Sequence, residues 1–249
     1  MTDGSVSRET ATPPVPDEAQ GVFADRLDLA VRYAELLATE GVVRGLIGPR
    51  EAPRLWDRHL LNCAVLEEVV EQEASVCDIG SGAGLPGIVL AIARPDLAVT
   101  LVEPLLRRTT FLEEVVTSLH LNNVRVVRAR ADALHGVERF DVVTSRAVAA
   151  LPKLLDWSLP LVAPTGEVVA LKGGNVEREV AEAAELMVER GCAPAQVLQV
   201  GIGRIPEPTW VVRIAWSDPA SVSSDIEHPK KSTRPARSSK RERRRRDGR

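Results

Sequence analysis

The chain has 249 residues, of which 44% are hydrophobic and only 3% are aromatic. This length and composition suit one α/β domain with extensions, whose core is built from aliphatic side chains. The three cysteines, Cys63, Cys77 and Cys192, are odd in number and lack metal-ligand spacing, so we expect a reducing cytosol and no disulfide framework. No apolar run reaches membrane-spanning length and the N-terminus lacks an apolar signal segment, so we expect a cytoplasmic protein with no membrane partner and no metal.

Charge is distributed unevenly along the chain. Residues 229–249 hold eleven Lys or Arg and two acidic residues, which gives this segment a net charge of +9. Because the whole chain has a net charge of −3, residues 1–228 carry a net charge of −12. We predict that residues 218–249 form a disordered basic tail and that the polar, proline-containing residues 1–20 are also disordered. The tail is interpreted as an electrostatic tether for RNA, and the alternative is a solvated segment that only aids solubility.

Two helices are predicted before the first strand. Residues 22–39 place Phe23, Leu27 and Ala30 on one stripe, which is typical of an amphipathic helix. A second helix is predicted over residues 53–71. Residues 21–73 are therefore expected to form an N-terminal helical cap on the domain that follows.

Strands and helices then alternate over residues 74–217. Apolar runs predict strands at 76–79, 99–102, 124–127, 141–144, 167–171, 196–200 and 210–216. Helical spacing predicts helices from residue 85 and over 107–119, 151–161 and 176–190. The alternation indicates an α/β fold with a mostly parallel, Rossmann-like sheet and right-handed crossovers. The last two strands have no helix between them, so the final strand is expected to be antiparallel.

The stretch VCDIGSGAGLPG, residues 76–87, combines a buried strand, a glycine turn and the start of a helix. Glycines let the backbone approach a ligand closely, and the free N–H groups of a first helical turn point toward it. The glycines Gly82, Gly84 and Gly87 also fit the dinucleotide fingerprint. The sequence therefore predicts a ligand site that includes Gly80, Gly82, Gly84 and Leu85.

Two acidic residues narrow the choice of ligand. Asp78 ends the first strand, where an ionised carboxylate suits a cationic ligand better than a pyrophosphate. Glu103 ends the second strand, where an acid can accept hydrogen bonds from both ribose hydroxyls. A ribose with a positive centre and no phosphate describes S-adenosylmethionine. A nicotinamide-dependent oxidoreductase that uses Gly82, Gly84 and Gly87 is the alternative.

Further polar residues follow the other parallel strands, whose carboxyl ends share one edge of the sheet. Asp132, with the backbone of Ala131, is positioned to bind an adenine, although a helix-capping role fits equally well. Arg146 and Lys172 could grip RNA phosphates or a ligand carboxylate, or each could be a solvated loop residue. Their occurrence at neighbouring strand ends favours a functional role for the pair.

Four motifs occur in order along the chain: DIGSGAGLPG, LVEP followed by Arg107 and Arg108, SRA at 145–147 and ALKGG at 170–174. On these motifs the chain resembles the RsmG family, also called glucose-inhibited division protein B. The resemblance covers roughly residues 55–216 and keeps the order of the motifs. Where family members commonly read H-x-L-D-S, this chain has Asn62 and Cys63 at the last two positions.

The resemblance implies an S-adenosylmethionine-dependent methyltransferase that modifies N7 of a guanine in 16S ribosomal RNA, as naked RNA or within a small-subunit particle. The implied cofactor contacts are Gly80, Leu85, Ala131, Asp132 and Arg146, with Glu103 at the ribose. The residues implied to face the RNA are Arg58, His59, Ser145 and Lys172. The protein is expected to act as a monomer.

The chemistry agrees with a site in which no acid–base pair can be recognised. Guanine N7 carries a lone pair and no proton, so methyl transfer to it requires positioning and no general base. Positioning alone can lower a barrier by about 7–11 kcal/mol. We therefore identify no catalytic acid or base, and we retain Arg146 and Lys172 as positioning candidates. A non-catalytic RNA-binding module is a third, more distant alternative.

Overall fold

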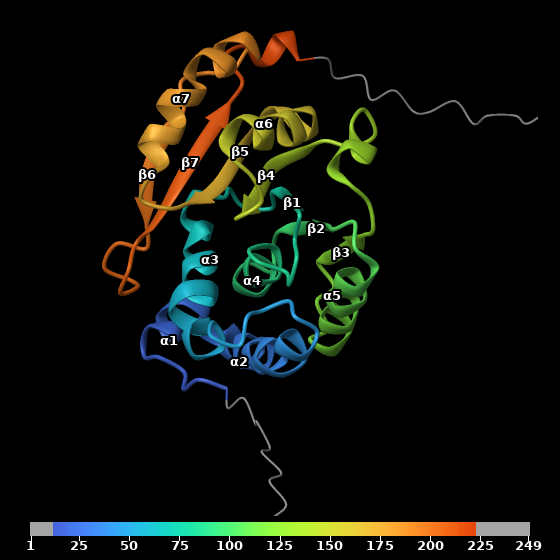
Figure 1. Cartoon of the computed structure of the whole chain (residues 1–249), viewed down its shortest axis with the longest axis vertical. Coiled ribbons are helices and arrows are strands. Elements are labelled where there is room, and N and C mark those ends of the chain that lie inside the picture. Colours follow the sequence, from blue (N-terminus) through green and yellow to red (C-terminus); the bar gives the residue numbers. More distant parts are fainter. Residues whose placement is uncertain (1–11, 223–249) are drawn as a thin grey trace, which may run out of the picture.

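The structure is a computed structural model that describes residues 12–222. The predictions for residues 1–11 and 223–249, which include most of the basic tail, lie outside the described residues. Within residues 12–222, seven strands form one sheet in the order β3-β2-β1-β4-β5-β7-β6. Helices cover both faces of this sheet (Figure 1).

The strands confirm a mostly parallel sheet with an antiparallel final strand. Their bounds are β1 Ser75–Ile79, β2 Ala98–Val102, β3 Val124–Val127, β4 Phe140–Arg146, β5 Val162–Lys172, β6 Gln196–Val200 and β7 Thr209–Ala215. The pairs β1–β2, β1–β4, β2–β3 and β4–β5 are parallel. Strand β7 runs antiparallel to both β5 and β6, as the missing crossover helix requires.

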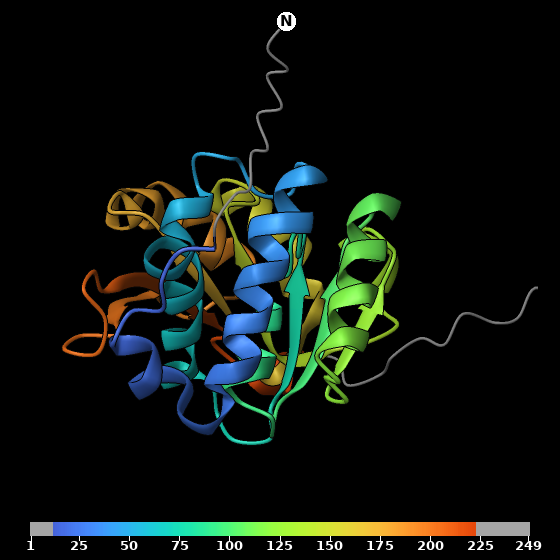
Figure 2. The same ribbon diagram turned by 90° about the horizontal axis from the view of Figure 1, so that it is seen from below.

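The helices form two layers. Their bounds are α1 Glu18–Phe23, α2 Leu27–Leu36, α3 Asn62–Ala64, α4 Gly87–Ala93, α5 Leu106–Ser118, α6 Leu151–Ser158 and α7 Val176–Glu189. Helices α6 and α7 lie on one face, and α1 to α5 lie on the other (Figure 1). Seen from below, α2 lies across the front of the sheet, which shows that the N-terminal helices cover this face (Figure 2).

Each face of the sheet contributes to its own apolar core. Along β5, Val169 belongs to the core shared with α1 to α5, whereas its neighbour Ala170 belongs to the core under α6 and α7. Val142 and Val143 divide in the same way on β4. Successive side chains of a strand point to opposite faces, so a strand buried on both faces is an uninterrupted apolar run. In the described part of the chain, no helix is long and apolar enough to cross a membrane.

The N-terminal helices differ from the prediction in detail. Helix α1 begins at Glu18, inside the segment predicted to be disordered, and the helix predicted over 22–39 is interrupted at Ala24, where φ is 47°. Phe23 packs edge-to-face on Trp56 with ring centroids 6.3 Å apart. This packing stabilises a break that helical spacing does not predict. The second predicted helix consists of short 3₁₀, π and α segments between residues 52 and 69.

Candidate active site

A pocket of about 650 Å³ opens at the carboxyl ends of β1 to β4. This volume is in the range of small-molecule sites. Most of the residues predicted to bind cofactor line it, namely Gly80, Gly82, Leu85, Glu103, Ala131, Asp132 and Arg146. The sheet therefore brings together residues that lie up to 66 positions apart in the sequence.

The glycine turn is held from both sides. The N–H groups of Gly80 and Ser81 donate to the carbonyl of Val102 at 2.8 and 3.2 Å. From the N-terminal helices, the buried Tyr33 hydroxyl donates to the Ala83 carbonyl at 2.7 Å. Gly84 adopts φ of 98°, and a Cβ there would lie 2.8 Å from the Tyr33 hydroxyl oxygen. Helix α2 thus fixes the turn that forms the wall of the pocket.

Asp78 and Gly84 do not lie on the wall of this pocket. Asp78 is fully buried behind the turn, where its Oδ2 accepts a hydrogen bond from the Gly87 N–H at 3.0 Å. Burial raises the pKa of Asp78 to about 7. Its other oxygen, Oδ1, is buried and has no hydrogen-bond partner among the described residues. The acid therefore organises the start of α4 and is not positioned to face a ligand directly, contrary to the interpretation from the sequence.

Glu103 lines the pocket at the end of β2, and it also supports the glycine turn. Its Oε2 accepts from the Gly82 N–H at 3.0 Å and from Arg108 at 3.3 Å, and its Oε1 accepts from the Leu105 N–H at 3.1 Å. The side chain is almost completely buried, although the residue lines the pocket. These bonds fix the carboxylate in one orientation at the end of β2. A contact with ribose hydroxyls stays a prediction.

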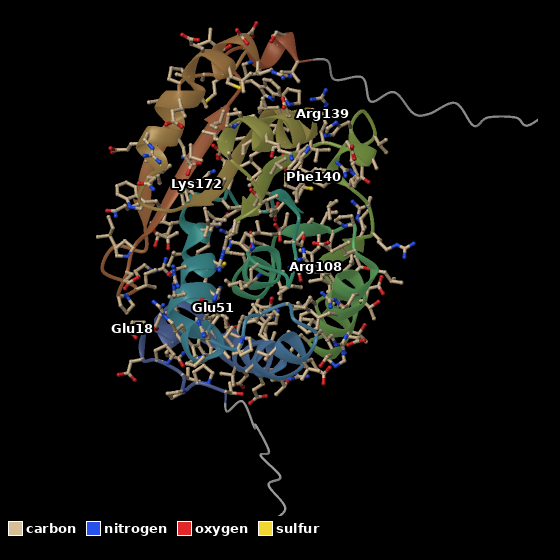
Figure 3. All side chains as sticks on the ribbon, viewed as in Figure 1. Glu18, Glu51, Arg108, Arg139, Phe140 and Lys172 are labelled. Atoms are coloured by element: carbon tan, nitrogen blue, oxygen red, sulfur yellow. The ribbon has the colours of Figure 1, made fainter. Side chains whose placement is uncertain are left out.

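A second pocket adjoins the first. All four residues predicted to face RNA line it, namely Arg58, His59, Ser145 and Lys172. Five residues line both pockets: Glu51, His59, Arg146, Ala147 and Val148. Figure 3 shows Lys172 on the β5 side of the molecule and Glu51 on the side of the N-terminal helices. Two ligands placed in these pockets would meet beside Arg146.

A chain of hydrogen bonds holds Arg146 at the junction. One guanidinium nitrogen contacts His59 Nδ1, and the other donates to the carbonyl of Arg58 at 3.1 Å and to Cys63 Sγ at 3.3 Å. Burial and the charge of Arg146 lower the pKa of His59 to about 4, so the imidazole is neutral at neutral pH. Because Nδ1 accepts from Arg146, the ring proton lies on Nε2 and is donated to Glu51 at 3.0 Å.

Lys172 and Ser145 lie at the far side of this junction. The Lys172 ammonium pairs with Glu179 at 2.8 Å, and both residues line the second pocket. Its charge is therefore already partnered within the chain, and a direct grip on an RNA phosphate stays a prediction. Ser145 is almost completely buried near the end of β4. Strand β4 extends to Arg146, two residues beyond the predicted end, so both residues are held in the sheet.

Sequence reasoning missed several lining residues. Glu51 and Leu46 belong to the segment between the predicted N-terminal helices, which carries no recognisable motif. Ala147 adopts φ of 53°, an uncommon conformation for a residue with a Cβ. Strained backbone of this kind is concentrated at functional sites.

Among residues 12–222, no cluster of three or more His, Cys, Asp or Glu side chains could hold a metal ion.

Known proteins resemble this chain over most of its length. The family described as GidB, rRNA small subunit methyltransferase G, matches residues 26–204. A relative from Nocardioides sp., named ribosomal RNA small subunit methyltransferase G, is 63% identical over 232 residues, which cover 93% of this chain and 92% of the relative. The chain belongs to this family. A relative of the same name from Thermobifida fusca is 57% identical, and the match covers 80% of this chain and 84% of the relative.

One solved structure shows the same fold. A SAM-dependent methyltransferase from Aquifex aeolicus has a TM-score of 0.50 and 18% sequence identity, over 69% of this chain and 97% of that one. Membership of the GidB family does not support the nicotinamide-dependent oxidoreductase that the glycine spacing left open.

Proposed function

We propose that the chain transfers a methyl group from S-adenosylmethionine to N7 of a guanine in 16S ribosomal RNA. The observation that carries this proposal is the pair of adjoining pockets that share Arg146, in a chain that belongs to a ribosomal RNA methyltransferase family. A methyl group must pass in line between two bound partners, and the junction of two pockets is the place for such a transfer. We expect the reaction to take place in the cytoplasm, on naked RNA or on a small-subunit particle.

The first pocket fits the cofactor. Its volume of about 650 Å³ accommodates an adenosyl group with its amino-acid arm, and its glycine turn lets the backbone approach closely. Glu103 offers a fixed carboxylate for the ribose, and Asp132 lies on the 3₁₀ turn after β3, where an adenine would reach. When bound, the sulfonium of the cofactor supplies an electrophilic methyl group.

The residues at the junction act by positioning. Guanine N7 has a free lone pair, so none of them needs to remove a proton. The neutral His59 and the Glu51 carboxylate keep the Arg146 guanidinium in one orientation between the pockets. A planar guanidinium with several N–H donors can orient an RNA base or phosphate without rotating during the reaction. Fixing both reactants in this way can supply about 7–11 kcal/mol of the barrier reduction.

The target guanine must reach the second pocket as an unpaired base. N7 lies on the major-groove edge, and the major groove of an A-form helix is too narrow for protein side chains. The second pocket is open to solvent on the side of Arg58 and Glu207, both of which are exposed. A base turned out of a loop or of an incompletely assembled subunit can enter there.

Two measurements test this proposal. Calorimetric titration is expected to show binding of S-adenosylhomocysteine and none of NAD. Incubation with small ribosomal subunits and S-adenosylmethionine carrying a radioactive methyl group is expected to label the 16S RNA. Binding of NAD alone, or label that appears only in ribosomal protein, would contradict the proposal.

A further inference from the structure

The second pocket must do more than expose N7. Both adenine and guanine carry an unprotonated N7, so an enzyme that methylates this atom in one purine must read another edge of the base. With N7 at the junction beside Arg146, the six-membered ring of the purine points to the far part of the pocket. Guanine presents the donors N1–H and N2–H₂ there, whereas adenine presents an acceptor.

Three carboxylates line the second pocket, and two of them already have a partner. Glu51 contacts His59 at 3.0 Å, and Glu179 pairs with Lys172 at 2.8 Å. Glu207 forms no ion pair within residues 12–222, and it does not line the first pocket. It is thus a carboxylate available to accept hydrogen bonds in the part of the pocket away from the cofactor.

The loop that carries Glu207 is anchored to the N-terminal helical layer. Arg204 pairs with Glu67 at 2.7 Å and with Glu68 at 2.8 Å, and the Gly201 N–H donates to Glu68 at 3.0 Å. Ile205 is almost fully buried in the same core. These contacts fix the connection between β6 and β7, so the position of Glu207 at the pocket is built into the fold.

Unpaired polar atoms occur at the same place. Thr209 is only 7% exposed and lines the second pocket, and its hydroxyl oxygen has no hydrogen-bond partner among the described residues. The same is true of Asn62 Oδ1, although Asn62 as a whole is less buried. Buried polar atoms are rarely left unpaired in a folded protein. Two such atoms in residues that line the same pocket as the Glu207 carboxylate indicate a site that a polar ligand completes.

We propose that the second pocket is the guanine-recognition site and that Glu207 accepts hydrogen bonds from N1–H and N2–H₂ of the target base, with Thr209 beside it. This inference rests on the proposed function and names how its substrate is read. The carboxylate also has an electrostatic role. Methyl transfer moves the positive charge of the sulfonium onto the guanine ring, so Glu207 interacts more strongly with the transition state than with the neutral base.

The test compares methyl transfer to small ribosomal subunits by the full chain and by three variants. Glu207→Ala is expected to lower kcat by about 10- to 100-fold, which corresponds to loss of hydrogen bonds to a charged acceptor. Glu207→Gln keeps a hydrogen-bond acceptor without the charge, so its kcat is expected to lie between that of Glu207→Ala and that of the wild type. Glu185→Gln, an exposed change on α7 outside both pockets, is the matched control and is expected to leave kcat unchanged.

Measuring the affinities for cofactor and for RNA distinguishes recognition of the base by Glu207 from a general effect of a surface charge. Loss of a surface carboxylate alone would tighten RNA binding without lowering kcat, because the RNA is an anion, and that result would overturn the inference. An equal loss of S-adenosylhomocysteine binding in Glu207→Ala would overturn it too, since Glu207 would then act through the cofactor. If the wild type forms no N7-methylguanine, the proposed function itself fails. If the wild type forms it and Glu207→Ala forms it at the same rate, only the inference about Glu207 fails.

Discussion

At the scale of the residue, Glu103 has two tasks that a substitution would remove together. It accepts from the Gly82 N–H and from Arg108, and it lines the pocket at the expected ribose position. We expect Glu103→Ala to weaken binding of S-adenosylhomocysteine by about 1–3 kcal/mol, as measured by calorimetry. A 2′,3′-dideoxy analogue is expected to lose less affinity. Equal losses for both ligands would show that Glu103 acts only through the turn.

Glu51 acts on Arg146 through His59. We expect Glu51→Ala to lower kcat by about 10- to 100-fold, because a displacement of about 1 Å at a reacting centre can have an effect of this size. Glu51→Gln keeps an acceptor for the imidazole N–H and is expected to recover most of the rate. Glu51 also lines the first pocket, so kcat is measured at saturating S-adenosylmethionine, where a change in cofactor affinity does not contribute. An unchanged kcat in Glu51→Ala would contradict this role.

Asp78 makes stability depend on pH. Its pKa of about 7 in the folded chain lies above the usual value near 4, so between these values the folded state holds a proton that the unfolded state has released. The free energy of unfolding therefore contains a contribution that is complete below about pH 4 and is lost as the pH rises through 7. Asp78→Asn keeps an acceptor for the Gly87 N–H, so we expect it to flatten this dependence. Urea unfolding of the wild type and of Asp78→Asn at pH 5 and pH 8 measures the effect. An equal change in the free energy of unfolding between these pH values in both proteins would contradict it.

At the scale of the element, the glycine turn depends on a helix that precedes it by fifty residues. Tyr33 on α2 donates to the Ala83 carbonyl at 2.7 Å, and it is the one tyrosine of the chain. Tyr33→Phe keeps the ring but removes this bond, so we expect S-adenosylhomocysteine to bind about 2- to 10-fold more weakly. Calorimetry measures the change, and a circular-dichroism melt serves as the control for folding. Unchanged affinity would show that the turn holds its conformation without α2.

The elements that could be predicted from sequence are those whose signal is local. Apolar runs revealed all seven strands, and the missing crossover helix revealed that β7 is antiparallel. The break at Ala24 and the early start of β5 at Val162 could not be predicted, because they depend on tertiary packing and on pairing with β4. Motif spacing also indicated most of the residues that line the first pocket, whereas their contacts with a cofactor stay predictions.

The residues that sequence reasoning misplaced or missed are positioned by tertiary contacts that a sequence pattern does not show. Asp78 was expected to face a ligand, but the direction of its side chain is set by the Gly87 N–H, which a pattern does not show. Glu51 and Glu207 lie on irregular segments, so their approach to the pocket depends on how those segments are anchored. Topology therefore predicts which residues reach this edge of the sheet, but it predicts neither the direction of a buried side chain such as that of Asp78 nor the path of a loop.

At the scale of the whole molecule, the basic segment at residues 229–249 lies outside the described residues, and its charge alone supports a prediction. Its net charge of +9 opposes a net charge of −12 on the remainder of the chain. Affinity gained by releasing counterions from single-stranded RNA falls with salt, with a slope of about 0.7 per phosphate contacted. Deletion of residues 229–249 is expected to weaken RNA binding and to flatten this slope.

The same deletion is expected to leave cofactor affinity and the identity of the methylated base unchanged, because phosphate contacts carry no sequence information. Titrations of 16S RNA at several salt concentrations, with and without residues 229–249, provide the comparison. Identical slopes would leave the segment without a role in binding.

The two-pocket arrangement is tested most directly by locating the methyl group. Small ribosomal subunits with unmethylated 16S RNA are incubated with the full chain and S-adenosylmethionine, and N7-methylguanine is detected by reduction and strand cleavage at the modified base. We expect cleavage at a single guanine, dependent on the cofactor and lost in Arg146→Ala. Methyl transfer to another atom or to adenine, or full activity of Arg146→Ala, would contradict the assignment of the two pockets.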